Sequence, residues 1–316
     1  MYIITGQTAT GKTSLALQLA KQHNGELINC DSRQIYKHLN IITGKDIDIK
    51  AKFTLKQKLG KFTIGYDPLT PSHIKIWLYN IVDPKIPFSS YDWATCAKIA
   101  IKDIVKRGKT PIIVGGTYLY IKHLLYGFET EKIPPNWKLR KLFNQKSVSG
   151  LQKELKKIAP DVFNKLNQSD VANPQRLIRK IEIALYNSKQ LSVNSRQSTV
   201  GSSKFYDLPS DSEGKFENFI GFKYKDKNQL IKAITKRVNL RIKQGALNEV
   251  RLLLAKNYLP TDPGLKTIGY SQLIEHFSGK VSLKEVVNTW IIRETQYAKR
   301  QFTFMKKDSN IHWHYI

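Results

Sequence analysis

The amino-acid sequence predicts an α/β fold, with a parallel sheet between two layers of helices and a helical domain inserted into the chain. Two observations lead to this prediction. Up to about residue 127, short apolar runs alternate with segments of helical period, and this alternation is typical of βαβ units. A charge-rich helical stretch and a Ser-rich segment then interrupt the pattern, before an apolar run resumes at residue 219.

The expected elements follow in chain order. Short apolar runs that end at Gly or Asp predict buried strands, and segments with a period near 3.6 residues predict helices. Residues 45–71 fit neither pattern, and their five Lys between Lys50 and Lys61 predict a basic loop or an edge hairpin. The predicted strands are Tyr2–Thr5, Leu27–Cys30, Trp77–Val82, Pro111–Val114 and Phe219–Phe222, and the predicted helices are Ser14–His23, Asp92–Arg107, Tyr118–Tyr126 and Asn228–Gly245.

Two changes in composition bound the inserted domain. Pro134 and Pro135 stop any helix that begins before them, and residues 138–190 are helical in pattern and rich in charge. Residues 192–215 contain seven Ser together with Gly and Pro, which is typical of a linker. We therefore expect a core with C-terminal helices at residues 1–127 and 217–316, and a helical insert with a Ser-rich return linker at residues 128–216.

The charge balance indicates the kind of partner. The chain has 316 residues, with 52 Lys and Arg against 25 Asp and Glu, and a formal charge of +27. Such an excess is costly through self-repulsion unless a polyanion offsets it, so nucleic acid is the favoured partner. A solvated Lys-rich surface is the alternative interpretation.

Cysteine usage and hydropathy indicate the compartment. Cys30 and Cys96 are the only cysteines, 66 positions apart and without clustered His, which favours neither a disulfide framework nor a zinc site. The first residues carry no basic leader, and no apolar run approaches the ~18 residues that a membrane span requires. We expect a cytoplasmic protein with no membrane partner that acts as a monomer.

Residues Gly6–Thr13 (GQTATGKT) fit the phosphate-binding motif G-x-x-x-x-G-K-[ST] in full, between a predicted strand and a predicted helix. In that context the motif predicts a P-loop NTPase-like core. The glycines permit a tight path on which backbone N–H groups face an anion, and the helix N-terminus adds partial positive charge. Lys12 would neutralise the terminal phosphate, and the Thr13 hydroxyl would bind Mg²⁺. The predicted phosphate-binding residues are Gly6, Thr8, Ala9, Thr10, Gly11, Lys12 and Thr13.

Acidic residues at strand ends bear on the reaction. A kinase or ATPase of this class needs a carboxylate at the end of a later strand, but Pro111–Val114 runs into Gly115-Gly116-Thr117. The nearest strand-end carboxylates are Asp31 and Asp83. Asp83 fits an ordinary turn residue before a proline. Asp31 fits either a helix N-cap or a general base that faces the phosphate loop, and its position alone leaves both open.

Six short motifs, in a fixed order, carry a family resemblance. They are Gly6–Thr13, Asp31–Tyr36 (DSRQIY), Gly115–Tyr120 (GGTYLY), Asn173–Arg179 (NPQRLIR), Ile268–Tyr270 (IGY) and Ala298–Thr303 (AKRQFT). In this order they resemble the tRNA dimethylallyltransferase family, also called tRNA isopentenyltransferases, from Gly6 to about Lys306. The phosphate loop is generic, whereas the other five motifs are specific to that resemblance.

The resemblance implies transfer of a dimethylallyl group from dimethylallyl diphosphate to N6 of adenine 37, in tRNA numbering, with release of diphosphate. It places the diphosphate in the phosphate loop, with Thr8 near the bridging oxygen. Because the N6 lone pair is delocalised into the purine ring, a carboxylate that accepts the proton would assist attack, and Asp31 is the candidate. The loop amides, Lys12 and Mg²⁺ held by Thr13 would stabilise the leaving group. The predicted catalytic residues are Asp31, Lys12 and Thr8.

The same resemblance implies how tRNA binds. The adenine must leave its stack and enter a channel in the protein, while the insert holds the anticodon stem-loop. For each cationic contact, a surface salt bridge is the alternative interpretation. The predicted tRNA-binding residues are Asp31, Ser32, Arg33 and Gln34 at the base, with Thr117, Arg140, Gln175, Arg176, Arg179, Lys299, Arg300 and Gln301.

Two positions depart from the family's pattern. Gln7 stands in the phosphate loop where Pro is usual, and we expect the backbone to tolerate it. Ala233 stands where the family has an Arg that contacts the diphosphate. We expect Lys232 or Arg237 to replace that Arg.

Three other functions compete with tRNA prenylation. A P-loop small-molecule kinase explains the phosphate loop but gives no role to the charge. A prenyltransferase acting on free adenylate has no need of the helical insert. A non-catalytic RNA-binding protein explains the charge but leaves the phosphate loop without a role.

Overall fold

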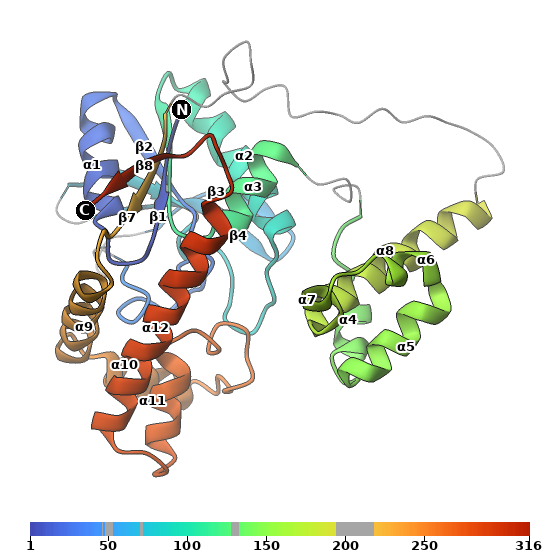
Figure 1. The fold of residues 1–316 in the computed structure, drawn as a ribbon. Helices are drawn as coiled ribbons and strands as arrows, with labels where there is room; N and C mark the ends of the chain where they lie inside the picture. Colours follow the sequence, from blue (N-terminus) through green and yellow to red (C-terminus); the bar gives the residue numbers. More distant parts are fainter. Residues whose placement is uncertain (46, 48–52, 70–71, 128–132, 194–217) are drawn as a thin grey trace. The chain divides into compact units, whose positions relative to one another are not determined.

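The fold was examined in a computed structural model, which describes residues 1–45, 47, 53–69, 72–127, 133–193 and 218–316 (Figure 1). The chain divides into two compact units, residues 1–125 with 207–316 and residues 126–206. The first border lies two residues from the one expected at residue 127, and the second expected border lies outside the described residues. The two units are described separately below.

An eight-stranded sheet forms the centre of the first unit, in the order β3-β4-β5-β2-β6-β1-β7-β8. From β5 to β8 all neighbouring strands are parallel, whereas β3, β4 and β5 pair antiparallel. Strands β1, β2 and β6 are almost wholly buried, and most of their residues are apolar. The bounds are β1 Tyr2–Gly6, β2 Gly25–Asn29, β3 Thr54–Leu59, β4 Phe62–Pro68, β5 Lys75–Trp77, β6 Thr110–Val114, β7 Phe219–Lys223 and β8 His312–Tyr315.

Alternating residues of these strands pack on opposite faces of the sheet. Ile4 and Leu27 belong to a cluster with Ala16 and Ala20 of α1, whereas Ile3 and Ile28 belong to the larger cluster that includes α2, α3 and the C-terminal helices. Helices therefore cover both faces, as predicted. The helices of this unit are α1 Lys12–Gln22, α2 Ser90–Lys106, α3 Tyr118–Tyr126, α9 Lys227–Lys243, α10 Ala246–Ala255, α11 Tyr270–Phe277 and α12 Leu283–Met305.

Three strand predictions need correction. The strand expected at Trp77–Val82 ends at Trp77, because Leu78 and Asn80 take positive φ angles of 67° and 53°, which extended pairing does not allow. The sheet is mixed rather than wholly parallel, since the described part of residues 45–71 forms the edge hairpin of β3 and β4. Strand β8 was not expected, because its sequence HWHY is short and mostly exposed.

The second unit is a small helical domain. Its helices are joined by short turns and enclose an apolar core of six buried side chains: Phe143, Leu151, Leu155, Leu177, Ile178 and Ile181. The helices are α4 Trp137–Phe143, α5 Val148–Ile158, α6 Pro160–Asn164, α7 Gln168–Val171 and α8 Pro174–Val193. Across both units, the described helices include none with the length and apolar character needed to cross a bilayer.

Candidate active site

The phosphate loop joins β1 to α1 at the carboxyl edge of the sheet. Gly6 has a φ of 127°, and a Cβ there would lie 2.2 Å from the Phe222 carbonyl oxygen, so the close packing of β1 on β7 requires glycine. Gly11 takes the left-handed conformation, with φ 76°, where α1 begins. Inside the loop, the Thr10 hydroxyl donates to the Gln7 carbonyl oxygen at 2.8 Å. The motif therefore has the strand, turn and helix context that anion binding requires.

A cavity of about 330 Å³, the loop cavity, opens at this loop. Its wall combines segments that are far apart in the sequence: the loop, the end of β2, the Gly-Gly turn after β6, α9 and α12. Asp31 is its one carboxylate among the described residues. The lining residues are Thr8, Ala9, Thr10, Gly11, Lys12, Thr13, Ser14, Asp31, Gln34, Gly44, Tyr79, Val114, Gly115, Gly116, Arg237, Leu240, Arg241, Gln244 and Gln301.

Three cations meet in the loop cavity. Lys12 Nζ donates to the Gln7 carbonyl oxygen, and Arg237 Nη1 donates to the Thr8 hydroxyl. Burial lowers the pKa of Lys12 to about 7, with a further lowering by Arg237 and an opposing effect of Asp31. Arg241 is the third cation in the wall. Two carboxylates accompany the three cations, Asp31 in the lining and Glu294 beside Arg241, so the cluster is short of negative charge, which an anionic ligand would supply.

Arg237 and Lys232 were the two candidates for the donor missing at Ala233. Arg237 contacts the loop through Thr8 and lines the cavity, whereas Lys232 is exposed and is not part of the cavity wall. Arg237 lies one helical turn after Ala233 on α9, so both positions share one stripe of the helix. Of the two candidates, the structure therefore places Arg237 at the loop.

Asp31 follows β2 directly. Its Oδ1 accepts the backbone N–H of Arg33 at 2.8 Å, and its own N–H donates to Asn29 Oδ1 at 3.0 Å. Residues 32–35 form turns rather than a helix, so the expectation of a helix N-cap is wrong and the carboxylate caps a turn. Within the described residues no hydrogen bond occupies Oδ2, and the Asp31 side chain lines the loop cavity. Asp83 is the turn residue expected, because its Oδ1 accepts the N–H of Lys85 at 2.9 Å.

The predicted base-site residues gather around Asp31. The Thr117 hydroxyl oxygen accepts the N–H of Ser32 at 3.0 Å, which joins the turn after β2 to the turn after β6. Gln34 lines the loop cavity, where its Nε2 donates to the carbonyl oxygens of Thr43 and Gly44 at 3.0 Å each. These residues are thus neighbours in space, and their contact with a base remains a prediction.

Gln301 connects α12 to the phosphate loop. Its Oε1 accepts the N–H of Thr8 at 3.0 Å, and its Nε2 donates to the Gly116 carbonyl oxygen at 3.0 Å. The side chain is buried. Gln301 therefore holds two walls of the loop cavity together, a role that the sequence did not indicate.

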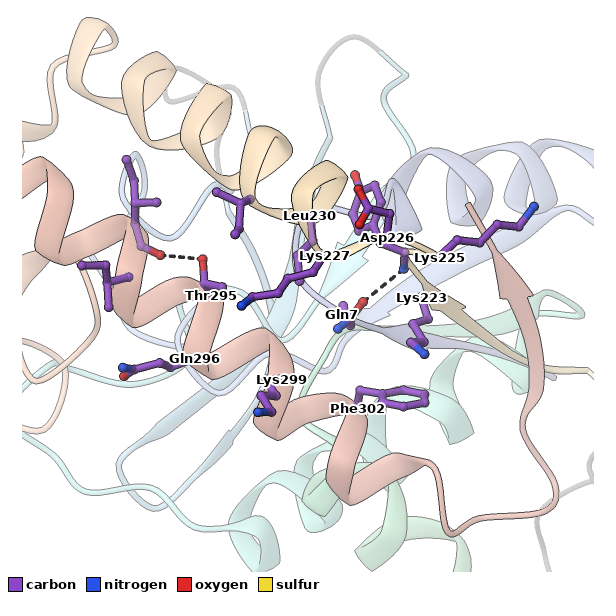
Figure 2. A pocket seen from close by; sticks show the side chains of 14 residues that line it. Gln7, Lys223, Lys225, Asp226, Lys227, Leu230, Thr295, Gln296, Lys299 and Phe302 are labelled. Atoms are coloured by element: carbon purple, nitrogen blue, oxygen red, sulfur yellow. Dashed lines mark hydrogen bonds between the residues drawn. The ribbon is translucent and has the colours of Figure 1, made fainter.

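Lys299 lines a different hollow, between α9 and α12, of about 640 Å³ (Figure 2). Leu230 and Phe302 contribute apolar surface there. Gln7 also lines this hollow and accepts the N–H of Tyr224 at 3.1 Å through its Oε1, so the residue that replaces the usual Pro ties the loop to the segment after β7. Arg300 is exposed and lines neither the hollow nor the loop cavity.

Tyr297 is a site neighbour that the sequence reasoning missed. Burial, together with the charge of Asp31, raises the pKa of this tyrosine to about 12, and its hydroxyl lies near the side chains of Thr117 and Gln301. The sequence gave no sign of a site at this position of α12, because an aromatic residue at helical spacing more often belongs to the core.

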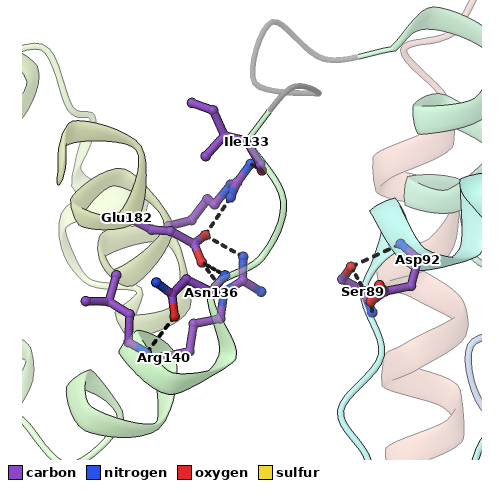
Figure 3. A network of polar contacts seen from close by, with 8 residues as sticks. Ser89, Asp92, Ile133, Asn136, Arg140 and Glu182 are labelled. Carbon is purple, nitrogen blue, oxygen red and sulfur yellow. Dashed lines mark hydrogen bonds and ion pairs between the residues drawn. The ribbon is translucent and has the colours of Figure 1, made fainter. Parts of the chain in front are cut away.

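Two of the four predicted tRNA contacts of the insert, Arg140 and Arg179, pair with a buried carboxylate, Glu182 (Figure 3). Arg140 donates to it from Nε at 3.1 Å and from Nη2 at 2.7 Å, and Arg179 donates from Nη1 at 2.5 Å. Arg176 instead pairs with Asp170 at 2.6 Å and is more exposed, and Gln175 donates to Asn144 at 2.9 Å. Arg140 and Arg179 therefore have a structural role, and their contact with tRNA remains a prediction.

Replacing Glu182 with Gln is expected to destabilise the insert by about 2 kcal/mol, because two half-buried arginines lose the buried carboxylate that they share. Burial raises the pKa of Glu182, but hydrogen bonds from Arg140 and Arg179 outweigh it and hold the pKa below its usual value. The stabilisation is therefore present above the ordinary pKa of Glu and is lost on acidification through the lowered pKa. Hydrogen exchange of peptides from residues 133–193 measures the loss.

The matched control is Glu154→Gln, which removes the exposed pair of Glu154 with Lys146 on the same unit. Its effect should stay below about 0.5 kcal/mol. Equal exchange in the two variants would contradict a stabilising role for the Glu182 network.

Together, the β1–loop–α1 unit and the cavity lined by three cations and Asp31 define an α/β protein with a P-loop-like core. The family model described as IPP transferase matches residues 61–308, and the model described as isopentenyl transferase matches residues 1–85. The chain belongs to the IPP transferase family. The resemblance seen in the six motifs is thereby confirmed.

Curated relatives agree with this assignment. A tRNA dimethylallyltransferase from Caldanaerobacter subterraneus subsp. tengcongensis is 34% identical, over 99% of this chain and 91% of its own length. One from Acetivibrio thermocellus is 33% identical, over 98% of this chain and 90% of its own length.

Solved structures share the fold. The tRNA isopentenylpyrophosphate transferase of Bacillus halodurans superposes with a TM-score of 0.62 at 26% identity, over 99% of this chain and 88% of that one. A eukaryotic dimethylallyltransferase acting on tRNA gives a TM-score of 0.70 at 25% identity, over 99% of this chain and 73% of that one. The predicted P-loop-like α/β fold class is confirmed.

Proposed function

We propose that this protein transfers a dimethylallyl group from dimethylallyl diphosphate to N6 of adenine 37 in the anticodon loop of tRNA, and releases diphosphate. One observation carries the proposal: the phosphate loop with its cations and the carboxylate of Asp31 line a single cavity. The relatives and structural neighbours reported above are named as tRNA prenyltransferases. They do not favour a small-molecule kinase or a free-adenylate prenyltransferase.

The reaction needs a proton acceptor and groups that stabilise a departing anion, and residues of both kinds line the cavity. Attack by N6 forms the new N–C bond to the allylic carbon, breaks the bond between that carbon and the diphosphate oxygen, and leaves a proton to be removed from the amine. Asp31, which lines the cavity, would accept that proton. Lys12, Arg237 and the loop N–H groups would stabilise the departing diphosphate, whose negative charge increases as the bond breaks.

The loop cavity also offers oxygen donors that suit Mg²⁺. Thr13, at the start of α1, and Asp31 both line it, and Mg²⁺ is commonly held by one or two protein oxygens together with phosphate oxygens and waters. When bound, the ion would neutralise charge on the diphosphate. We propose Thr13 as its protein ligand.

Several features support tRNA as the acceptor. The formal charge of +27 suits a polyanion, and the predicted contacts of the insert include exposed Arg176. Both cysteines are free and buried, which agrees with a reducing cytoplasmic compartment.

The direct test incubates the purified protein with dimethylallyl diphosphate, Mg²⁺ and an unmodified tRNA that carries adenine 37. Mass spectrometry of the digested tRNA should find N6-dimethylallyl adenosine. ATP hydrolysis without prenylated adenosine would favour the kinase alternative and contradict the proposal. Prenylation of free adenylate but not of tRNA would favour the other alternative.

Binding of tRNA should depend steeply on salt. If five predicted cations contact phosphates, affinity should fall about 500-fold between 50 and 200 mM salt, because each contact releases condensed counterions. Removing one of them, as in Arg300→Ala, should lower the slope of log affinity against log salt by about one unit. Fluorescence anisotropy with labelled tRNA measures both, with Arg251→Ala as the control. A flat dependence would show that charge does not drive binding. The five residues are Arg140, Arg176, Arg179, Lys299 and Arg300.

A further inference from the structure

Arg241 is a buried cation in the wall of the loop cavity to which the sequence assigned no role. It lies one turn after Arg237 on α9, and 5% of the residue is exposed. Its Nη1 donates to Glu294 Oε1 on α12 at 3.2 Å. The guanidinium also lies against Gly44, where an added Cβ would be 2.4 Å from Arg241 Nη2. The side chain is thus held on three sides, by α9, α12 and the turn at Gly44.

Glu294 takes up only part of the hydrogen-bonding capacity of Arg241. Within the part of the chain that the structure describes, the pair has one hydrogen bond, although a guanidinium has five donors. Glu294 Oε1 also accepts the indole N–H of Trp290 at 2.9 Å, and Oε2 has no partner among the described residues. The contact is therefore not the two-bond fork that arginine and carboxylate form when they satisfy each other. Donors of Arg241 remain for a ligand in the cavity that it lines.

Neighbouring cations make an anion at this position favourable. Burial lowers the pKa of Arg241 to about 9, with a further lowering by Arg237 and an opposing effect of Glu294. Lys12 and Arg237 line the same cavity. The three cations have two carboxylates beside them, Asp31 and Glu294, so a further anion would stabilise the buried guanidinium. A diphosphate has the charge and the planar sets of oxygens that guanidinium groups bind well.

We propose that Arg241 binds the diphosphate group directly, next to Arg237, and that Glu294 is the residue that positions its guanidinium. The inference rests on the proposed function, because it adds a ligand of the leaving group to that same cavity. With Arg241 included, the cations that bind diphosphate come from the phosphate loop and from α9. Arg237 and Arg241 are four residues apart and therefore lie on the same face of that helix.

The test measures binding of inorganic pyrophosphate to the full chain by calorimetry. The main variant is Arg241→Met combined with Glu294→Gln, which removes the cation without leaving a buried carboxylate unpaired. Its Kd for pyrophosphate should rise at least 10-fold, and its KM for dimethylallyl diphosphate should rise in parallel. The affinity for tRNA should stay within about twofold. Arg251→Met removes the same charge outside the cavity, where Arg251 contacts Asn248, and should leave pyrophosphate binding unchanged.

Two further variants separate binding from folding. Glu294→Gln alone retains the guanidinium and should weaken pyrophosphate binding by about threefold or less, because only its orientation is loosened. Arg241→Lys retains the charge and should fold if the double variant does not, yet it should still weaken binding because the planar donors are lost. Pyrophosphate binding within twofold of wild type in the folded double variant, or in Arg241→Lys if only that variant folds, would overturn the proposal. Weakened pyrophosphate binding together with a wild-type protein that prenylates no tRNA would instead support the Arg241 site and refute the proposed transfer.

Discussion

Replacing Asp31 with Asn is expected to lower the rate of prenyl transfer by about 10²–10⁴-fold while the protein stays folded. The amide can still accept the N–H of Arg33 that Asp31 Oδ1 accepts at 2.8 Å, so the turn after β2 is retained. What is lost is the basic oxygen in the loop cavity that would take the proton from N6. Single-turnover kinetics with saturating tRNA and dimethylallyl diphosphate measures the chemical step directly.

The matched control for Asp31→Asn is Asp83→Asn. Asp83 also follows a buried segment and caps a turn, through the N–H of Lys85, but it bonds the Tyr258 hydroxyl at 2.9 Å and lines neither described hollow. Its replacement should change the rate less than about threefold. Loss of tRNA or pyrophosphate affinity in Asp31→Asn equal to its loss of rate would show that Asp31 is structural and not a base.

Contiguous signals explain why much of the fold was predictable. Strands β1, β2 and β6 are short and mostly apolar, and burial on both faces is what such runs require. The strand expected at Trp77–Val82 was wrong beyond Trp77 for a reason that is not local. Asn80 accepts a hydrogen bond from buried Lys45 at 2.7 Å and takes a positive φ. That contact joins residues 35 positions apart, and no apolar pattern indicates it.

The candidate site also has residues that the sequence could predict and residues that it could not. The phosphate loop and Asp31 were found because each follows a predicted strand, and parallel strands bring their carboxyl ends to one edge. Gln301 and Arg241 come from helices more than 200 residues later, and the tertiary fold alone brings them to the loop. On a helical wheel, Arg241 lies beside Arg237, and two such arginines are typical of a solvated helix face. The burial of Arg241 shows only once α12 and the turn at Gly44 are packed against it.

Replacing Lys12 with Met is expected to lower the rate of transfer by about 10²–10³-fold, because a donor aimed at the departing diphosphate is lost. Met fills a similar volume, so the loop should keep the bond of the Thr10 hydroxyl to Gln7. Lys21→Met, near the end of the same helix, removes an equal charge where it is exposed, and should leave the rate unchanged within about twofold.

The lowered pKa of Lys12 gives this prediction a pH dependence of known sign. Burial holds the pKa of Lys12 at about 7 in the free protein, so above pH 7 the amine is increasingly neutral. Because diphosphate favours the charged amine, Lys12 must then take up a proton from solvent when diphosphate binds. Pyrophosphate affinity should therefore fall as pH rises above 7, and the pKa of Lys12 should rise on binding. NMR of the ¹³C-labelled Lys12 side chain follows both states. A titration near 10.5 in the free protein would show that the cavity leaves the lysine fully charged, and would remove the coupling between protonation and diphosphate binding.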